Sequence, residues 1–176
     1  MRIHMIVVSL VLAISTTLSI APVQAATEGQ CQSLQSQDFS NIIDASTHVM
    51  SSRVVAAAND VPDYCQVKGY VSSSVEFEMR LPLKNWNGKF IKRGCGGFCG
   101  SVFIAACDNH VKDGYACVAS DMGHTSTALD AKWAYNDIQA EIDFGYRATH
   151  VVTVAGKAIT ESFYDNAPSR SYFMGC

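Results

Sequence analysis

Strand and helix patterns alternate along most of this chain, and their order restricts the fold more than any other feature of the sequence. Residues 75–81 alternate strictly between apolar and charged side chains, which predicts a half-buried strand near a sheet edge. Further strands are predicted at 89–93 and 115–120 and, opening towards a turn, at 170–176; a helix is predicted at 101–112, and one long helix or two end to end at 137–164. Strands joined through helices build a parallel or mixed sheet covered by helices, so we expect the α/β class.

The N-terminal 25 residues have the composition of a secretory signal peptide. Arg2 precedes an apolar run over residues 5–20, and small residues around Ala25 form a cleavage pattern. An N-terminal membrane anchor is the alternative, but the run is shorter than the about 20 apolar residues of a spanning helix. We therefore expect cleavage after Ala25, a secreted or periplasmic protein, and no membrane association afterwards.

The remaining residues have few charges and no repeat or linker that would divide them into separate units. Charged residues make up 16% of the sequence, with 13 Lys and Arg against 16 Asp and Glu. Binding to a phosphate backbone requires clustered positive charge, so DNA and RNA are not expected as partners. We expect residues 26–74 to form an N-terminal extension and residues 75–176 to form the main domain.

Seven cysteines follow the predicted cleavage site, and in an oxidising compartment they are expected to form disulfides. They are Cys31, Cys65, Cys95, Cys99, Cys107, Cys117 and Cys176. A Cys31–Cys65 bridge would hold the N-terminal extension together, while the remaining pairings stay open. Cys95 and Cys99 could instead bind a metal, but no histidine or second cysteine pair stands at zinc-site spacing, so no metal is expected. Because seven cysteines form at most three pairs, we expect Cys176 to have no partner among the other six.

Three loops are candidates for the functional site. Ligands of α/β sheets bind beyond the carboxyl ends of the strands, so loops 94–100 and 121–127, with any loop after Cys176, should share one edge. Gly96 and Gly97 could donate backbone N–H groups to an oxyanion. The alternative is a tight turn held by a bridge such as Cys95–Cys99. The glycine spacing matches neither the G-x-x-x-x-G-K-[ST] motif of nucleotide-binding loops nor the G-x-G-x-x-G motif of dinucleotide-binding folds.

Acidic and histidine side chains near these loops have both catalytic and structural interpretations. Asp121 and His124 follow a predicted buried strand, where side chains face a cleft. His124 could act as a general base, or it could be held by hydrogen bonds within its loop. Carboxylates at Asp137, Glu141 and Asp143 are explained by the positive end of the predicted helix.

Several segments, taken together, resemble the tannase and feruloyl esterase family of secreted serine esterases. They are Trp86–Phe90, Gly94–Gly100, Gly114–His124, Phe144–His150, Val154–Ala158 and Arg170–Cys176. The similarity covers nearly all of the chain after the leader, and the last segment is its most specific part. It implies an α/β-hydrolase fold and cleavage of aromatic-acid esters by a Ser-His-Asp triad through an acyl-enzyme.

The same resemblance assigns roles to individual positions. In the family, a Gly-Cys pair that corresponds to Gly175-Cys176 directly precedes the nucleophilic serine, and the cysteine pairs with one beside the catalytic histidine. Residues 75–176 would then be the N-terminal part of a catalytic domain, with Gly96 or Gly97 in its oxyanion hole. The triad and the lid with its calcium site would lie outside this chain, which would be inactive and without a cofactor.

A second interpretation is a small secreted binding module that is held together by disulfides and does no catalysis. Such a module should end in a well-covered element. The apolar Tyr172-Phe173-Met174 near the end of this chain is instead typical of a strand from the interior of a larger sheet. The sequence therefore favours the esterase interpretation.

Overall fold

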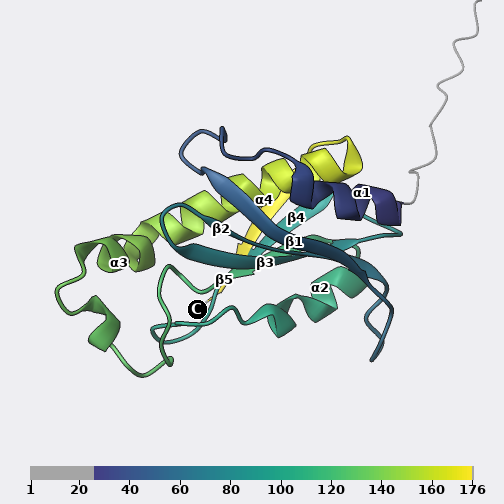
Figure 1. Ribbon diagram of the computed structural model, residues 1–176. Helices are drawn as coiled ribbons and strands as arrows, with labels where there is room; N and C mark the ends of the chain where they lie inside the picture. Colours follow the sequence, from purple (N-terminus) through teal and green to yellow (C-terminus); the bar gives the residue numbers. More distant parts are fainter. Residues whose placement is uncertain (1–25, 176) are drawn as a thin grey trace, which may run out of the picture.

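The computed structural model describes residues 26–175, which form a six-stranded mixed sheet with helices on both faces (Figure 1). The predicted leader and Cys176 lie outside the described residues. The strands are β1 (Thr47–Val55), β2 (Tyr64–Val71), β3 (Val75–Pro82), β4 (Lys89–Arg93), β5 (Ala116–Ser120) and β6 (Arg170–Met174). The helices are α1 (Glu28–Ser33), α2 (Asp108–Lys112), α3 (Ile138–Ile142) and α4 (Ala148–Tyr164).

The sheet has the strand order β1-β2-β3-β5-β4-β6. Its first three strands form an antiparallel meander, and β5 pairs antiparallel with β3. β4 lies between β5 and β6 and is parallel to both. The predicted α/β class is confirmed, and the carboxyl ends of the three parallel strands lie at one edge.

The predicted position of residues 75–81 near a sheet edge is wrong, because β3 lies inside the sheet between β2 and β5. Two of the three charged side chains of β3, Glu78 and Arg80, form ion pairs, while Glu76 is exposed. Glu78 is buried and lies 3.4 Å from the Lys68 ammonium, and Arg80 bonds to Asp108 at the start of α2. The strict alternation therefore marks an interior strand with one partly ion-paired face.

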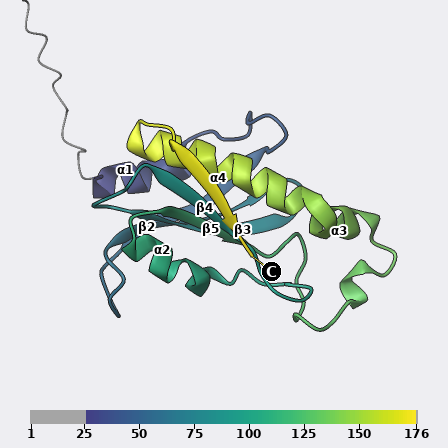
Figure 2. The same cartoon turned by 180° about the vertical axis from the view of Figure 1, so that it is seen from behind.

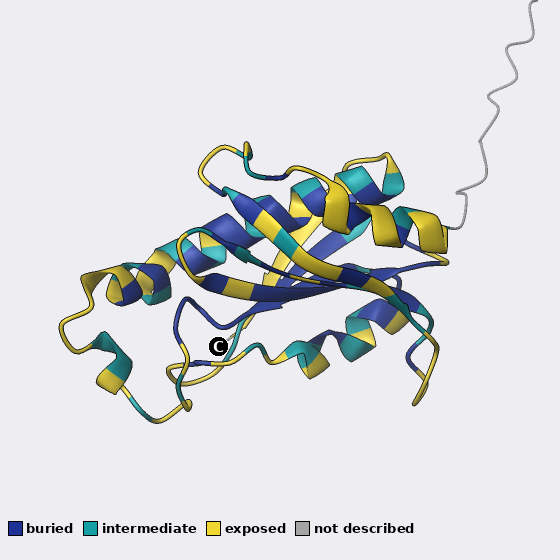
Figure 3. Cartoon of the chain, in the orientation of Figure 1, coloured by how far each residue is buried: buried dark blue, intermediate teal, exposed yellow. Residues whose placement is uncertain are grey.

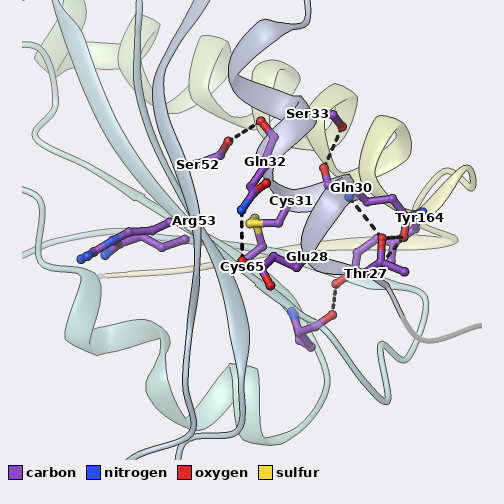
Figure 4. The surroundings of a disulfide bond; sticks show 12 residues. Thr27, Glu28, Gln30, Cys31, Gln32, Ser33, Ser52, Arg53, Cys65 and Tyr164 are labelled. Atoms are coloured by element: carbon purple, nitrogen blue, oxygen red, sulfur yellow. Dashed lines mark hydrogen bonds between the residues drawn. A yellow bond between two sulfur atoms is a disulfide. The ribbon is translucent and has the colours of Figure 1, made fainter.

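Residues 26–74, expected to form an extension, contribute α1, β1 and β2 to the same unit. The sequence analysis predicted none of these elements. The Cys31–Cys65 bridge is present, as predicted, and attaches α1 to β2 (Figure 4). Thr27 caps α1, since its hydroxyl accepts from the Gln30 amide at 3.2 Å. The segment is thus built into the sheet.

The helix expected at 101–112 is shorter than predicted. Gly100 has a φ of +85° and Phe103 a ψ of 68°, so the backbone becomes helical only at a 3-10 turn, Ile104–Cys107, that leads into α2. The second predicted helix is two helices, α3 and α4, joined end to end by the π-helical turn Asp143–Arg147. No helix among residues 26–175 has the length and apolar character needed to cross a membrane.

Helix α4 covers one face of the sheet and α2 the other (Figures 1 and 3). A Cβ atom at Gly156 of α4 would lie 2.8 Å from the Phe90 ring, so glycine permits the close approach of α4 to β4. The smaller cluster on the α2 face includes Ile91, Val111 and Cys117. β4 and β5 are therefore covered on both faces, as central parallel strands require.

Strand β6 forms the sheet edge beside β4 (Figure 2). All five of its residues are exposed, including Tyr172 at 42%, Phe173 at 58% and Met174 at 53%. Within residues 26–175 this strand pairs only with β4. Its apolar side chains thus remain accessible although its backbone belongs to the sheet.

The three disulfides, Cys31–Cys65, Cys95–Cys99 and Cys107–Cys117, close loops of very different length, with sequence separations of 34, 4 and 10. If their effect is mainly to restrict the unfolded chain, replacing each pair with alanines should cost about 4, 2 and 3 kcal/mol respectively. Urea unfolding of the three double variants, followed by circular dichroism, measures this order. A larger loss for Cys95–Cys99 than for Cys31–Cys65 would contradict the expectation.

Candidate active site

A pocket of about 190 Å³ lies at the edge where β4 and β5 end. Its lining residues are Gly94, Cys95, Gly97, Cys99, Met122, Phe144, Thr149 and Phe173. Loops 94–100 and 121–127 meet there, since the Gly100 amide donates to the Asp121 carbonyl and the Ser126 amide donates to the Gly100 carbonyl. The expectation that these two loops share one edge is confirmed. The end of the chain after Gly175 lies outside the described residues.

The glycine loop combines a fixed backbone with two free amides. Gly97 has a φ of +58°, and a Cβ atom there would lie 2.3 Å from the Ala128 carbonyl oxygen, whereas Gly96 faces open space. The Phe98 amide donates to Ala128 at 2.9 Å. Among residues 26–175, nothing accepts a hydrogen bond from the N–H of Gly96 or Gly97. Both N–H groups are therefore available to an acceptor from outside.

The Cys95–Cys99 bridge spans this loop and forms part of the pocket wall. One of the two interpretations of the loop predicted such a bridge, and its presence leaves the Gly96 and Gly97 amides free. Cys99 and Met122, both in the pocket wall, have φ values of +60° and +70°. Residues other than Gly, Asn and Asp rarely adopt this region, and within residues 26–175 only these two do so, which places backbone strain at the pocket.

Asp121 joins the second loop to the sheet. Its side chain is 4% exposed, and Oδ1 accepts hydrogen bonds from the amides of Glu76 at 3.0 Å and Gly123 at 2.8 Å. Burial raises the pKa of this carboxyl to about 6, although the two amide bonds oppose the shift. Asp121 lies behind the pocket, whose wall is formed by the next residue, Met122.

His124 is also held behind the pocket wall. Its Nε2 lies 2.8 Å from the Phe98 carbonyl, and its ring stacks on Trp133 with the centroids 3.8 Å apart. The edge of the Phe144 ring meets the same imidazole. No serine hydroxyl among the described residues hydrogen bonds to a histidine. These contacts give His124 a structural role, but its hydrogen-bond partner lies in the 94–100 loop rather than in its own loop.

Two charged residues near the pocket are buried, which the sequence analysis did not predict. Lys92 is 1% exposed, and its Nζ donates to the Arg93 carbonyl at 2.8 Å and to Ser120 Oγ at 2.9 Å. Burial lowers the pKa of Lys92 to about 8, against the opposing charge of Asp121. The only signal in the sequence was that Lys92 alternates with Ile91 and so shares a strand face with the apolar Phe90.

Asp143 is the second of these residues, and the helix-end explanation is wrong for it. The side chain is fully buried and accepts hydrogen bonds from Arg147 at 2.7 Å and Gln139 at 3.1 Å. Asp143 begins the π turn between α3 and α4, so it lies in the first turn of neither helix. The explanation does hold for Asp137, whose carboxylate accepts from the Ala140 amide at 3.0 Å and caps α3.

The described residues do not fit the calcium site that the family resemblance implies for a lid. Within residues 26–175, no three His, Cys, Asp or Glu side chains gather closely enough to hold a metal ion. Both cysteines of the Cys95–Cys99 pair, the metal candidate in the sequence, are bonded to each other.

Comparisons with known proteins agree with this geometry. Residues 52–176 match the family described as tannase and feruloyl esterase. The chain is 33% identical over 177 residues to a probable feruloyl esterase B-2 of Aspergillus flavus, covering 96% of this chain and 33% of that protein. It is 32% identical over 143 residues to the mono(2-hydroxyethyl) terephthalate hydrolase of Piscinibacter sakaiensis, covering 69% and 24%.

Among solved structures, the feruloyl esterase B of Aspergillus oryzae matches with a TM-score of 0.74 and 26% identity, covering 85% of this chain and 32% of that one. The mixed sheet and its helices are those of an esterase of the α/β-hydrolase type. The chain belongs to the tannase and feruloyl esterase family of carboxylic ester hydrolases. It spans about a third of the length of the Aspergillus relatives.

Alanine at the two central glycines should have different effects on stability. At Gly97 the new Cβ would meet the Ala128 carbonyl and the positive φ would be strained, so Gly97→Ala should cost about 1–3 kcal/mol. At Gly96 the Cβ would meet open space, so Gly96→Ala should change stability by less than about 0.5 kcal/mol. Urea unfolding measures both, and equal losses would contradict the described loop conformation.

The raised pKa of Asp121 predicts how stability depends on pH. Between about pH 4 and pH 6 the folded state binds more protons than the unfolded state, so the free energy of unfolding falls as the pH rises through this window. Asp121→Asn should remove that fall, whereas Asp44→Asn, at an exposed aspartate, should keep it. Thermal unfolding at a series of pH values measures the effect. A fall that persists unchanged in Asp121→Asn would contradict the assignment.

Proposed function

We propose that this chain forms part of a secreted or periplasmic serine esterase that cleaves esters of aromatic acids, and that its 94–100 loop supplies half of the oxyanion hole. The observation that carries the proposal is the pair of unpaired amides at Gly96 and Gly97, in a loop that lines the pocket. Preorganised N–H donors that stabilise a developing oxyanion are the largest single contribution in many acyl-transfer enzymes.

The pocket wall supports an aromatic ester as the substrate. Phe144 and Phe173 contribute rings, Met122 a thioether and Cys95–Cys99 a disulfide, so the wall offers apolar contacts beside Gly97. An aromatic acyl group would bury its ring against these side chains while its ester carbonyl accepts from the amides. The names of the relatives, feruloyl esterase and terephthalate hydrolase, point to the same substrate class.

The proposed chemistry is acyl transfer through a covalent intermediate. A serine Oγ attacks the ester carbonyl and gives its proton to a histidine, and the glycine amides bind the resulting oxyanion. The alcohol leaves with that proton, and water then hydrolyses the acyl-enzyme in the same way. The serine, histidine and aspartate of this scheme are not among the residues assigned to the site here. The described residues contribute the oxyanion donors and part of the acyl pocket.

Ligand binding to the mature chain tests the site without requiring turnover. Titrating the ¹⁵N-labelled protein with methyl ferulate should shift the amide signals of Gly96 and Gly97. Phe144→Ala should weaken this binding at least about fivefold, because an apolar wall of the pocket is lost. The control Phe103→Ala removes an exposed ring outside the pocket lining and should leave the affinity unchanged. Shifts confined to other regions would contradict the proposed site.

The 176-residue chain should not hydrolyse methyl ferulate or p-nitrophenyl esters. Among its described residues no serine hydroxyl is hydrogen-bonded to a histidine, so these residues supply no activated nucleophile. A spectrophotometric assay on the purified chain measures this. Turnover that a serine-directed inhibitor abolishes would show that the chain contains a complete triad.

A further inference from the structure

Lys92 occupies a position where a charged side chain needs an explanation. It lies on β4 between β5 and β6, and its side chain is 1% exposed. Because side chains alternate along a strand, Lys92 shares the α4 face of the sheet with Phe90, which contacts Gly156. Removing an ammonium group from water costs several kcal/mol unless strong hydrogen bonds compensate. An apolar residue would be the ordinary choice for this site.

The contacts of Lys92 join the ends of the two central strands. Its Nζ donates to the Arg93 carbonyl at 2.8 Å and, across the sheet, to Ser120 Oγ at 2.9 Å. The Ser120 hydroxyl in turn lies 3.6 Å from the sulfur of Met122. Met122 is part of the pocket wall, so the network runs from the end of β4 to the pocket.

The Arg93 carbonyl belongs to the peptide group at which β4 ends and the glycine loop begins. The N–H of this group, on Gly94, donates to the Met174 carbonyl of β6 at 2.8 Å. In a trans peptide the carbonyl points to the opposite side, toward β5. The pairing of β4 with β5 ends at Lys92 and Val118, so no strand N–H is in register there. Lys92 supplies the missing donor and fixes this peptide group from its second side.

Lys92 can donate to the Arg93 carbonyl and to Ser120 Oγ in both of its protonation states. An ammonium group has three N–H donors and a neutral amine has two, so both bonds survive the loss of one proton. Burial lowers the pKa of Lys92 to about 8, and Asp121 is the neighbouring charge that opposes this shift. The link between the strand ends therefore does not require the charged form.

We propose that Lys92 is a positioning residue for the oxyanion loop: its Nζ holds the 93–94 peptide group and thereby sets the direction in which Gly96 and Gly97 present their amides. The link to catalysis rests on the proposed function, whereas the mechanical role stands on the hydrogen bonds alone. Lys92 itself touches no substrate in this role.

Lys92→Met separates this role from a contribution to overall stability. In this variant the loop amides should lose protection from exchange, whereas the overall stability should not fall. Methionine fills a similar volume without a buried charge, so the melting temperature should stay equal or rise. Without the donor, the loop should open more often. Exchange of the Phe98, Cys99 and Gly100 amides should then accelerate at least about tenfold, while the amides of α4 should not exchange faster.

Native-state hydrogen exchange followed by NMR measures both effects in one sample. Lys89→Met is the matched control, because it removes a lysine from the other end of the same strand. Its loop amides should exchange as in the wild type. Ser120→Ala removes one of the two acceptors and should accelerate the loop amides severalfold, which keeps the proposal testable if Lys92→Met does not fold.

Wild-type loop exchange in Lys92→Met, or in Ser120→Ala where the first variant does not fold, would overturn the proposal. Parallel acceleration in the loop and in α4 would also overturn it, because it would reveal general destabilisation. Titration of the wild-type protein with methyl ferulate tests the proposed esterase site separately. If the loop exchanges faster in Lys92→Met but the wild-type protein binds no methyl ferulate, the positioning role stands and the esterase site does not.

Discussion

The parallel pairing of β4 with β5 and β6 is the constraint on which the rest of the structure depends. Parallel strands must be joined by crossovers, so the helical segments between them are required by the pairing itself. Because all three strands point the same way, their carboxyl ends open at one edge. The glycine loop, the 121–127 loop and the pocket are all consequences of this common direction.

The pocket edge is also where the fold departs most from ordinary packing. Left-handed backbone at Cys99 and Met122, a buried aspartate with a raised pKa and a buried lysine all lie within two adjoining loops and the strand ends beneath them. Each of these features reduces stability when taken alone. The hydrogen bonds of Asp121 to two amides and of Lys92 to two oxygens compensate for part of this cost. Such concentrations of strain and buried charge are common at functional sites.

The sequence was most informative where one pattern had one physical meaning. The strand predicted at 115–120 from its apolar run is present as β5, and the helix predicted to start at Asp137 begins there as α3. Residues 47–71 were not recognised as strands, because their polar residues do not alternate cleanly and β1 is half solvated. The position of β3 was predicted incorrectly because two of its charges are paired by Lys68 and Asp108, which no local pattern reveals.

The bridge between Cys95 and Cys99 has a consequence for the order in which the site is assembled. Closing a loop between cysteines four residues apart requires little chain entropy, so this ring can form before the sheet exists. The sheet must instead bring together partners such as Phe77 and Ser120, 43 positions apart (120 − 77 = 43). Oxidation of these two cysteines would therefore restrict the conformations of the glycine loop before the rest of the polypeptide has folded.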